Sequence, residues 1–172
     1  ALFGYISTAK FYYLWTLQNK KARWFPSAEQ GILVARAGNV ATNYSHDWYV
    51  GVALANEPGK PTERIKADAA AGIVGLWADI DIAGPAHASK IYPPTFADAE
   101  WVALSLGVEP TVLVHSGHGL QAWWLFKEPL VFTTPAERTV AAAQLRAFGQ
   151  ACQARAAAAG YDLDAVWDLA RI

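Results

Sequence analysis

The stretch Ile73–Ile82 reads IVGLWADIDI and carries the strongest strand signal in the chain. It is apolar apart from two aspartates, as is typical of a central strand that is buried on both faces. Side chains alternate across a strand, so we expect Asp79 and Asp81 on one face and Ile80 on the other. The sequence therefore predicts a pair of neighbouring carboxylates on one face of a buried strand.

Strand and helix signals alternate on both sides of this stretch. Thr95 is expected to cap one helix and Gly160 to end another, while two glycines mark a hairpin turn. The expected elements are strands over residues 48–54, 111–115 and 120–126, helices over 96–106 and 135–159, an amphipathic segment over 28–36, and loops over 43–47, 56–61 and 84–94. This order predicts an α/β fold, in the wide sense that includes α+β, with a mixed β-sheet flanked by helices.

The N-terminal region is rich in aromatic residues. Phe3, Phe11, Tyr12, Leu14 and Trp15 are spaced loosely, like the residues on one face of a helix. The spacing therefore predicts a helix within residues 1–25.

The composition is that of a globular protein. The chain has 172 residues, of which 53% are hydrophobic and 17% charged, enough for one domain with a substantial core. No apolar run approaches the ~20 residues that a membrane span needs, so no membrane partner is expected. A net charge of −1 argues against a protein that simply coats nucleic acid, although a local basic path remains possible.

The single cysteine and the ends of the chain bear on its cellular setting. Cys152 has no second cysteine to pair with, so an internal disulfide is excluded and a thiolate zinc site is disfavoured. The N-terminal residues do not read as a secretory leader, so export is not expected and a cytoplasmic location is expected. The chain contains no methionine, which suggests a fragment of a longer protein.

The aspartate pair is the first candidate site. Two carboxylates about 6–7 Å apart on a buried strand repel each other and lose hydration, which is costly without a compensating cation. Hard oxygen ligands of this kind select Mg²⁺ or Mn²⁺. The structural alternative is that Asp79 and Asp81 lie at a frayed strand end and are solvated by the following loop.

The second candidate is the segment Ser116–Gly119, which reads SGHG. Two glycines allow a tight turn whose backbone can approach a ligand closely, and the hydroxyl of Ser116 and a ring N–H of His118 are natural phosphate donors. The alternative is an ordinary hairpin turn with a structural histidine.

The third candidate is a further carboxylate near the C-terminus. Asp168, with Arg171 three residues on, could complete a two-metal cluster with the strand pair. Asp162 and Asp164 are rivals, and the sequence spacing alone does not rank them.

Taken in order, these pieces resemble the archaeo-eukaryotic primase superfamily, especially the primase-polymerases of phages, plasmids and other mobile elements. The family signature is a hydrophobic strand with DxD or DxE, then SxH, then a hydrophobic residue followed by Asp. Here these motifs are 76–81 (LWADID), 116–118 (SGH) and 166–168 (VWD), with similar surroundings at 48–52 (WYVGV) and 168–172 (DLARI). The resemblance covers roughly residues 40–172.

The resemblance implies a DNA primase or polymerase, a nucleotidyltransferase that uses two Mg²⁺ or Mn²⁺ ions to join NTPs or dNTPs on a DNA template and primer. It implies the following roles: Asp79, Asp81 and Asp168 as catalytic metal ligands, Ser116 and His118 as triphosphate contacts, and Arg171 as a further nucleotide contact. The fold it implies is a single catalytic domain, residues 1–172, with an N-terminal α/β part to about residue 70 and an RRM-like part over about 71–172.

The chain departs from the family pattern at its end. Relatives continue beyond Ile172 into a further conserved stretch, and accessory priming domains or a helicase often accompany them. Two other functions remain open from the residues alone. One is a metal-dependent nuclease, since carboxylate clusters also hydrolyse phosphodiesters, and the other is a non-catalytic DNA-binding module for replication initiation.

Overall fold

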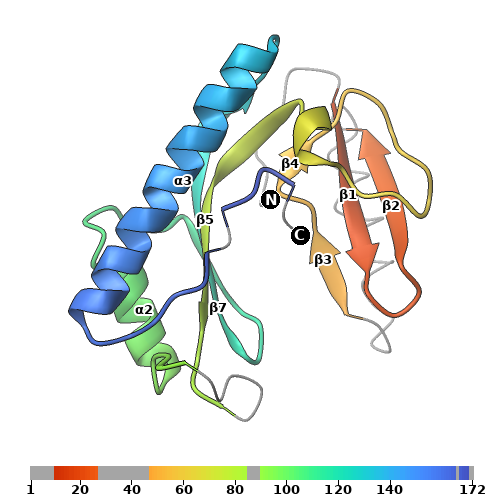
Figure 1. Cartoon of the computed structure of the whole chain (residues 1–172). Helices are drawn as coiled ribbons and strands as arrows, with labels where there is room; N and C mark the ends of the chain where they lie inside the picture. The colour runs from red at the N-terminus through yellow and green to blue at the C-terminus, as the bar shows by residue number, and fades with distance from the viewer. Residues whose placement is uncertain (1–9, 27–46, 85–89, 166, 171–172) are drawn as a thin grey trace. The chain divides into compact units, whose positions relative to one another are not determined.

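The computed structural model of the chain describes residues 10–26, 47–84, 90–165 and 167–170. Among these residues, strands dominate the first half of the chain, and α-helices precede and follow a hairpin in the second half (Figure 1). The elements are β1 (Phe11–Thr16), β2 (Lys21–Pro26), β3 (Trp48–Val50), β4 (Ala53–Leu54), the short 3-10 helix η2 (Ala67–Ala69), β5 (Gly72–Asp81), α2 (Phe96–Leu104), β6 (Val112–His115), β7 (Gly119–Val131) and α3 (Pro135–Ala158). The α/β class predicted from the sequence is confirmed.

The strands form two sheets, one in the order β2-β1-β3 and one in the order β4-β5-β7-β6. The pairs β1–β2, β1–β3, β4–β5 and β6–β7 are antiparallel. β5 and β7 also run in opposite directions, because Ile82 N–H bonds to the His118 carbonyl at one end and Phe132 N–H bonds to the Ala71 carbonyl at the other. The predicted mixed sheet is thus built, in its described pairs, from antiparallel neighbours.

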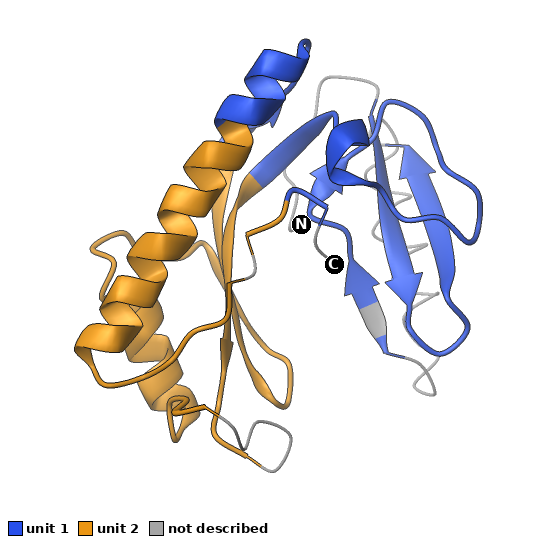
Figure 2. Cartoon of the chain, viewed as in Figure 1, with its two compact units in different colours: residues 1–74, 127–140, 169–172 blue, residues 75–126, 141–168 orange. Residues whose placement is uncertain are grey.

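The chain forms two compact units (Figure 2). Unit 1 comprises residues 1–74, 127–140 and 169–172, and unit 2 comprises residues 75–126 and 141–168. The β2-β1-β3 sheet lies in unit 1, and β6 with α2 lies in unit 2. The division into two parts near residue 70, which the family resemblance implies, stays a prediction.

The predicted N-terminal helix is wrong for the described residues. Phe11–Thr16 and Lys21–Pro26 form an antiparallel hairpin instead, while Phe3 lies outside the described residues. Tyr12, Tyr13 and Trp15 are buried in this sheet. Consecutive aromatic residues favour a pleated, half-buried strand over a helix, and this preference outweighs their loose helical spacing.

The single strand predicted over residues 48–54 is also wrong, because the chain changes sheets there. Trp48–Val50 pairs with β1, whereas Ala53–Leu54 pairs with β5. Gly51 N–H still bonds to the Tyr13 carbonyl at 3.1 Å, so the switch follows directly after it. The predicted strand is divided because its two parts pair with different strands, β1 and β5. The local sequence pattern does not encode this pairing. The predicted segment 28–36 lies outside the described residues.

The helices and the hairpin of the second half follow the sequence closely. The Thr95 hydroxyl accepts a hydrogen bond from Asp98 N–H at 3.2 Å and caps α2, which ends two residues earlier than predicted. α3 begins at Pro135 and ends before Gly160, whose φ of +84° suits a glycine stop. Neither α2 nor α3, the helices described, has the length and apolar character to cross a membrane.

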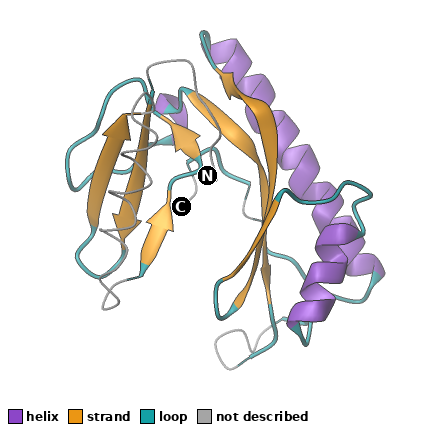
Figure 3. Ribbon diagram, turned by 180° about the vertical axis from the view of Figure 1, so that it is seen from behind, coloured by secondary structure: helices purple, strands orange, loops and turns teal. Residues whose placement is uncertain are grey.

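The core of unit 2 lies between its strands and the two helices, which cover one face of the sheet (Figure 3). Alternate residues of β5 and β7 point into it, together with small side chains of α2 and α3. The buried cluster contains Ala78, Ile80, Ala99, Val102, Ala103, Leu120, Ala122, Trp124, Cys152, Ala156 and Leu163. Because this packing buries the face of β5 that carries Ala78 and Ile80, the opposite face of β5 is the one that can bind a ligand.

Candidate functional site

The strand aspartates lie on the face of β5 that turns away from the helices. Ile80 is 1% exposed in the core, whereas Asp79 and Asp81 on either side of it are half-buried. Asp81 is the last residue of β5, and the next backbone N–H, that of Ile82, still bonds to the His118 carbonyl at 3.0 Å. Both acids therefore belong to an ordered ladder, which disfavours the frayed-end alternative.

β7 supplies the neighbouring groups on the same face. Gly119 lies directly beside Asp81, since a Cβ placed on Gly119 would come within 2.9 Å of the Asp81 Cα. Further along, the rings of Trp77 and Trp123 meet with centroids 6.1 Å apart. In this register Gln121, which is half-buried, lies across from Asp79. The carboxylate pair is thus bordered by a glycine and an amide.

The turn predicted at residues 116–119 is hydrogen-bonded to the chain just after Asp81, at the C-terminal end of β5. The backbone N–H and the hydroxyl of Ser116 both donate to the Gly119 carbonyl, at 3.0 and 3.1 Å, and Gly117 has a φ of +92° that favours glycine. The side chain of His118 is exposed, while its carbonyl holds Ile82. His118 is therefore accessible to a ligand, and the Ser116 hydroxyl would have to leave the turn carbonyl to donate to a phosphate.

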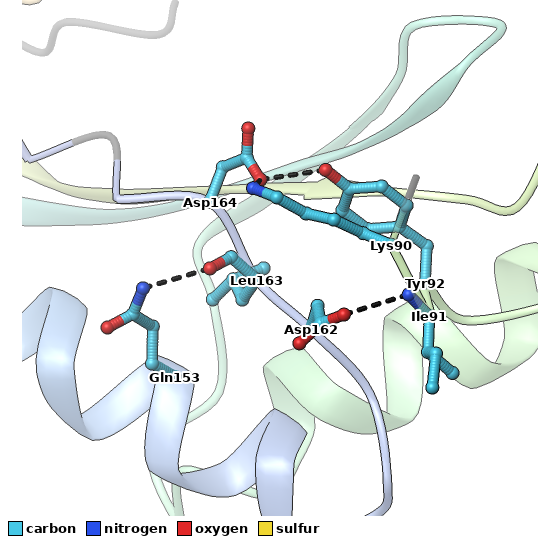
Figure 4. A network of polar contacts seen from close by, with 7 residues as sticks. All are labelled: Lys90, Ile91, Tyr92, Gln153, Asp162, Leu163 and Asp164. Atoms are coloured by element: carbon cyan, nitrogen blue, oxygen red, sulfur yellow. Dashed lines mark hydrogen bonds and ion pairs between the residues drawn. The ribbon is translucent and has the colours of Figure 1, made fainter. Parts of the chain in front are cut away.

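The C-terminal segment is tied to the loop that follows β5 (Figure 4). Asp162 N–H donates to the Ile91 carbonyl at 2.6 Å, and Ile91 N–H donates to the Asp162 carboxylate at 2.8 Å. Asp164 accepts from Lys90 at 2.5 Å and from the Tyr92 hydroxyl at 2.7 Å. The loop itself closes back on β5, since Ala83 N–H bonds to the Pro93 carbonyl at 2.9 Å.

Electrostatics link this network to the strand aspartates. Burial raises the pKa of the Tyr92 hydroxyl, and its hydrogen bond to Asp164 raises that pKa further. The negative charge of Asp81 adds a smaller effect in the same direction, so Tyr92 lies within the field of both carboxylates. The hydrogen bond to Asp164 likewise raises the pKa of the Lys90 ammonium. Tyr92 therefore binds Asp164 while it lies within range of the charge of Asp81.

The structural setting of Asp168, the third predicted metal ligand, is less closely defined than that of the two strand aspartates. Asp168 is exposed, on a segment without regular secondary structure, and Arg171 lies outside the described residues. Within the described ranges, no three or more His, Cys, Asp or Glu side chains form a group that could hold a metal ion. The oxygen donors of Asp79 and Asp81 suit a hard divalent cation, but the assignment of Asp168 as a third ligand stays a prediction.

Sequence reasoning missed the roles of Lys90 and Tyr92 altogether and treated Asp164 only as a rival ligand. One signal was available: residues 75–126 and 141–168 contain three lysines or arginines, Lys90, Arg146 and Arg155, against eight acids. A lone cation in a loop after an acidic strand is a natural partner for a carboxylate.

No protein-family model matches the chain, and no curated protein matches its sequence. Among solved structures, the AEP domain of the primase-polymerase of cyanophage S-2L is similar, with a TM-score of 0.47 and 13% sequence identity. The similarity covers 96% of this chain and 70% of that chain. No functional assignment follows from a similarity at this level.

Proposed function

We propose that this chain is a template-directed nucleotidyltransferase of the primase-polymerase type. The observation that carries the proposal is the Asp79 and Asp81 pair, half-buried on one face of an ordered strand whose end is bonded to the turn of Ser116 and His118. The order of the three sequence motifs supports it as well. The substrates are NTPs or dNTPs with a DNA primer and template.

Each group has a chemical task that suits its position. The carboxylates of Asp79 and Asp81 hold divalent metal, Mg²⁺ or Mn²⁺, because two carboxylates on one face of a strand offer the hard oxygen ligands that these cations prefer. When bound, the ions activate the attacking 3′-oxygen and neutralise the leaving pyrophosphate. The exposed ring of His118 donates a hydrogen bond to the triphosphate at the same end of the strand.

Lys90 and Tyr92 have a supporting task in this proposal. Both hold the carboxylate of Asp164, and the charge of Asp81 also raises the pKa of Tyr92 slightly. They keep the loop after β5 attached to the segment that leads to Asp168. The proposal therefore assigns them to positioning and leaves metal binding to the aspartates.

His118→Ala provides a test of the triphosphate contact. Loss of a hydrogen bond to a charged group costs about 1.5–3 kcal/mol, which corresponds to roughly a ten- to hundredfold rise in the nucleotide KM. Because the side chain is exposed, the melting temperature should stay unchanged. Steady-state primer extension and thermal melting measure the two quantities.

His115→Ala is the matched control for that variant. His115 stacks on Phe96 of α2 with ring centroids 4.5 Å apart, so its loss should affect stability before it affects the nucleotide KM. An unchanged KM in His118→Ala would remove the residue from the nucleotide site.

The choice of third ligand is tested by comparing Asp168→Asn with Asp164→Asn. We expect Asp168→Asn to lose activity and Mn²⁺ affinity with little change in stability, because Asp168 is exposed. Asp164→Asn should mainly lose the partly exposed ion pair with Lys90, which water screens, and should therefore change stability little. Primer extension and Mn²⁺ titration by calorimetry distinguish them, and the reverse pattern would make Asp164 the ligand.

A further inference from the structure

Charge is segregated between the two units. Unit 1 carries eleven lysines and arginines against seven acids, a net +4, whereas unit 2 carries three against eight, a net −5. The proposed metal ligands all lie in unit 2. A unit with net negative charge repels the phosphate backbone of a nucleic acid, whereas a unit with net positive charge attracts it.

Three of the lysines and arginines of unit 1 lie at the tip of the β1–β2 hairpin. Lys20 ends the turn between the strands, and Lys21 and Arg23 follow on β2. All three side chains are exposed, and within the described part of the chain none of them forms an ion pair. Lys21 and Arg23 are two residues apart on one strand and so point to the same side, with a spacing of about 6–7 Å.

The turn that presents these cations is held by side chains on both sides. Asn19 Oδ1 accepts from Lys21 N–H at 3.1 Å and from the Thr16 hydroxyl. Gln18 makes two bonds to Asp47, donating to its carboxylate at 2.6 Å and accepting from its N–H at 2.9 Å. Asp47 is the one acid among these contacts, and its carboxylate is engaged by Gln18.

Lys20 itself has an unusual backbone. Its φ is +51°, in the left-handed region, where a branched or long side chain is disfavoured and glycine or asparagine is preferred. Among the non-glycine residues that the structure describes, Lys20 is the one with a positive φ. A lysine held at such a position against the backbone preference points to a use for its charge.

We propose that this hairpin tip, defined by Lys20, Lys21 and Arg23, binds the phosphate backbone of single-stranded nucleic acid. The proposal rests on the proposed function, for which it names the surface that holds the template strand. Its support is charge complementarity: three exposed cations that form no ion pair within the described residues, on a turn held by side-chain hydrogen bonds, in the unit that carries the positive charge. An anionic membrane is disfavoured as the partner, because Leu17 is the one large apolar side chain exposed at this turn.

The test is equilibrium binding of a fluorescein-labelled oligothymidylate in EDTA, followed by anisotropy over a range of salt concentrations. The variant combines Lys20→Gly, Lys21→Gln and Arg23→Gln. Each phosphate contact to a single strand contributes about 0.7 to the slope of log K against log salt, so the slope should fall by about two. Lys20→Gly alone should lower the slope by about 0.7 without lowering the melting temperature, because glycine suits its φ.

The control removes the same charge elsewhere in unit 1 by combining Lys60→Gln, Lys66→Gln and Lys127→Gln. Lys60 pairs with Glu63 at 3.3 Å, and the charge of Lys66 also acts on Glu63. Binding by this control should keep a salt slope close to that of the unaltered chain. An equal fall in both triple variants would mean that only net charge matters and would overturn the proposal.

Two further comparisons separate this inference from the proposed function. Oligonucleotide binding through the hairpin without any primer extension would leave the inference standing and remove the function. Primer extension with unaltered binding by the hairpin variant would remove the inference alone. Loss of binding to phosphatidylserine vesicles, with oligonucleotide binding unchanged, would assign the hairpin to a membrane and overturn the proposal.

Discussion

Replacing both strand aspartates, Asp79→Asn together with Asp81→Asn, should lower metal-dependent nucleotide addition by at least about a thousandfold. Divalent metal contributes several kcal/mol to stabilisation of charge in the transition state of phosphoryl transfer, and each 1.4 kcal/mol is roughly a factor of ten in rate. The amide groups keep the shape of the side chains but are poor ligands for a hard cation. Primer extension with saturating Mn²⁺ measures the loss.

The same variant should fold normally. Removing two like charges from one face of a half-buried strand relieves their repulsion, so its melting temperature without metal should equal or exceed that of the unaltered chain. Mn²⁺ should raise the melting temperature of the unaltered chain, because it binds the folded state, and leave the variant unchanged. The control is Glu100→Gln, an exposed acid of α2, which should keep both activity and the Mn²⁺ response. Full activity in the double variant would exclude the pair from catalysis.

Gly119→Ala should damage both stability and activity, although it adds a single methyl group. The new Cβ would lie 2.6 Å from the Ile80 carbonyl oxygen and 2.9 Å from the Asp81 Cα. Both are backbone atoms of the central strand, so the clash can be relieved only by moving β5 and β7 apart, which changes the position of the Asp81 carboxylate relative to the turn of Ser116 and His118. Overpacking of this kind costs about 1–3 kcal/mol, which lowers the melting temperature of a chain of this size by several degrees.

Gly84→Ala is the matched control for that change. It lies three residues beyond Asp81, and a Cβ placed there meets nothing within 4 Å. We expect its melting temperature and its primer-extension rate to match those of the unaltered chain. If Gly119→Ala behaves in the same way as Gly84→Ala, then the close approach of β7 to Asp81 has no role in placing the carboxylate.

The elements that could be predicted from the sequence are those whose signals are local. β5 follows from its apolar run, α2 from the Thr95 cap, and α3 from Pro135 and Gly160. The N-terminal hairpin could not be predicted from spacing, because the loose spacing of aromatic residues such as Tyr12 also fits one face of a helix. Pairing with residues 21–26 decides between them, and that pairing depends on burial of the whole sheet.

The candidate site also has a part that local sequence signals predict and a part that they do not. The shared face of Asp79 and Asp81 follows from strand alternation alone. The position of Asp164 depends on hydrogen bonds to Lys90 and Tyr92, more than 70 residues away in the chain, and no periodicity encodes them. Because residues 161–165 have no regular secondary structure, their acids cannot be ranked from the sequence.

The most direct test of the proposed function is incubation of the chain with a primed DNA template, labelled dNTPs and Mn²⁺, with the products separated by length. The proposed function predicts that the primer is extended, that EDTA prevents extension, and that the Asp79→Asn, Asp81→Asn variant extends nothing. Shortening of the primer or template would identify a metal-dependent nuclease instead. DNA binding with neither extension nor shortening would identify a non-catalytic module and contradict the assignment.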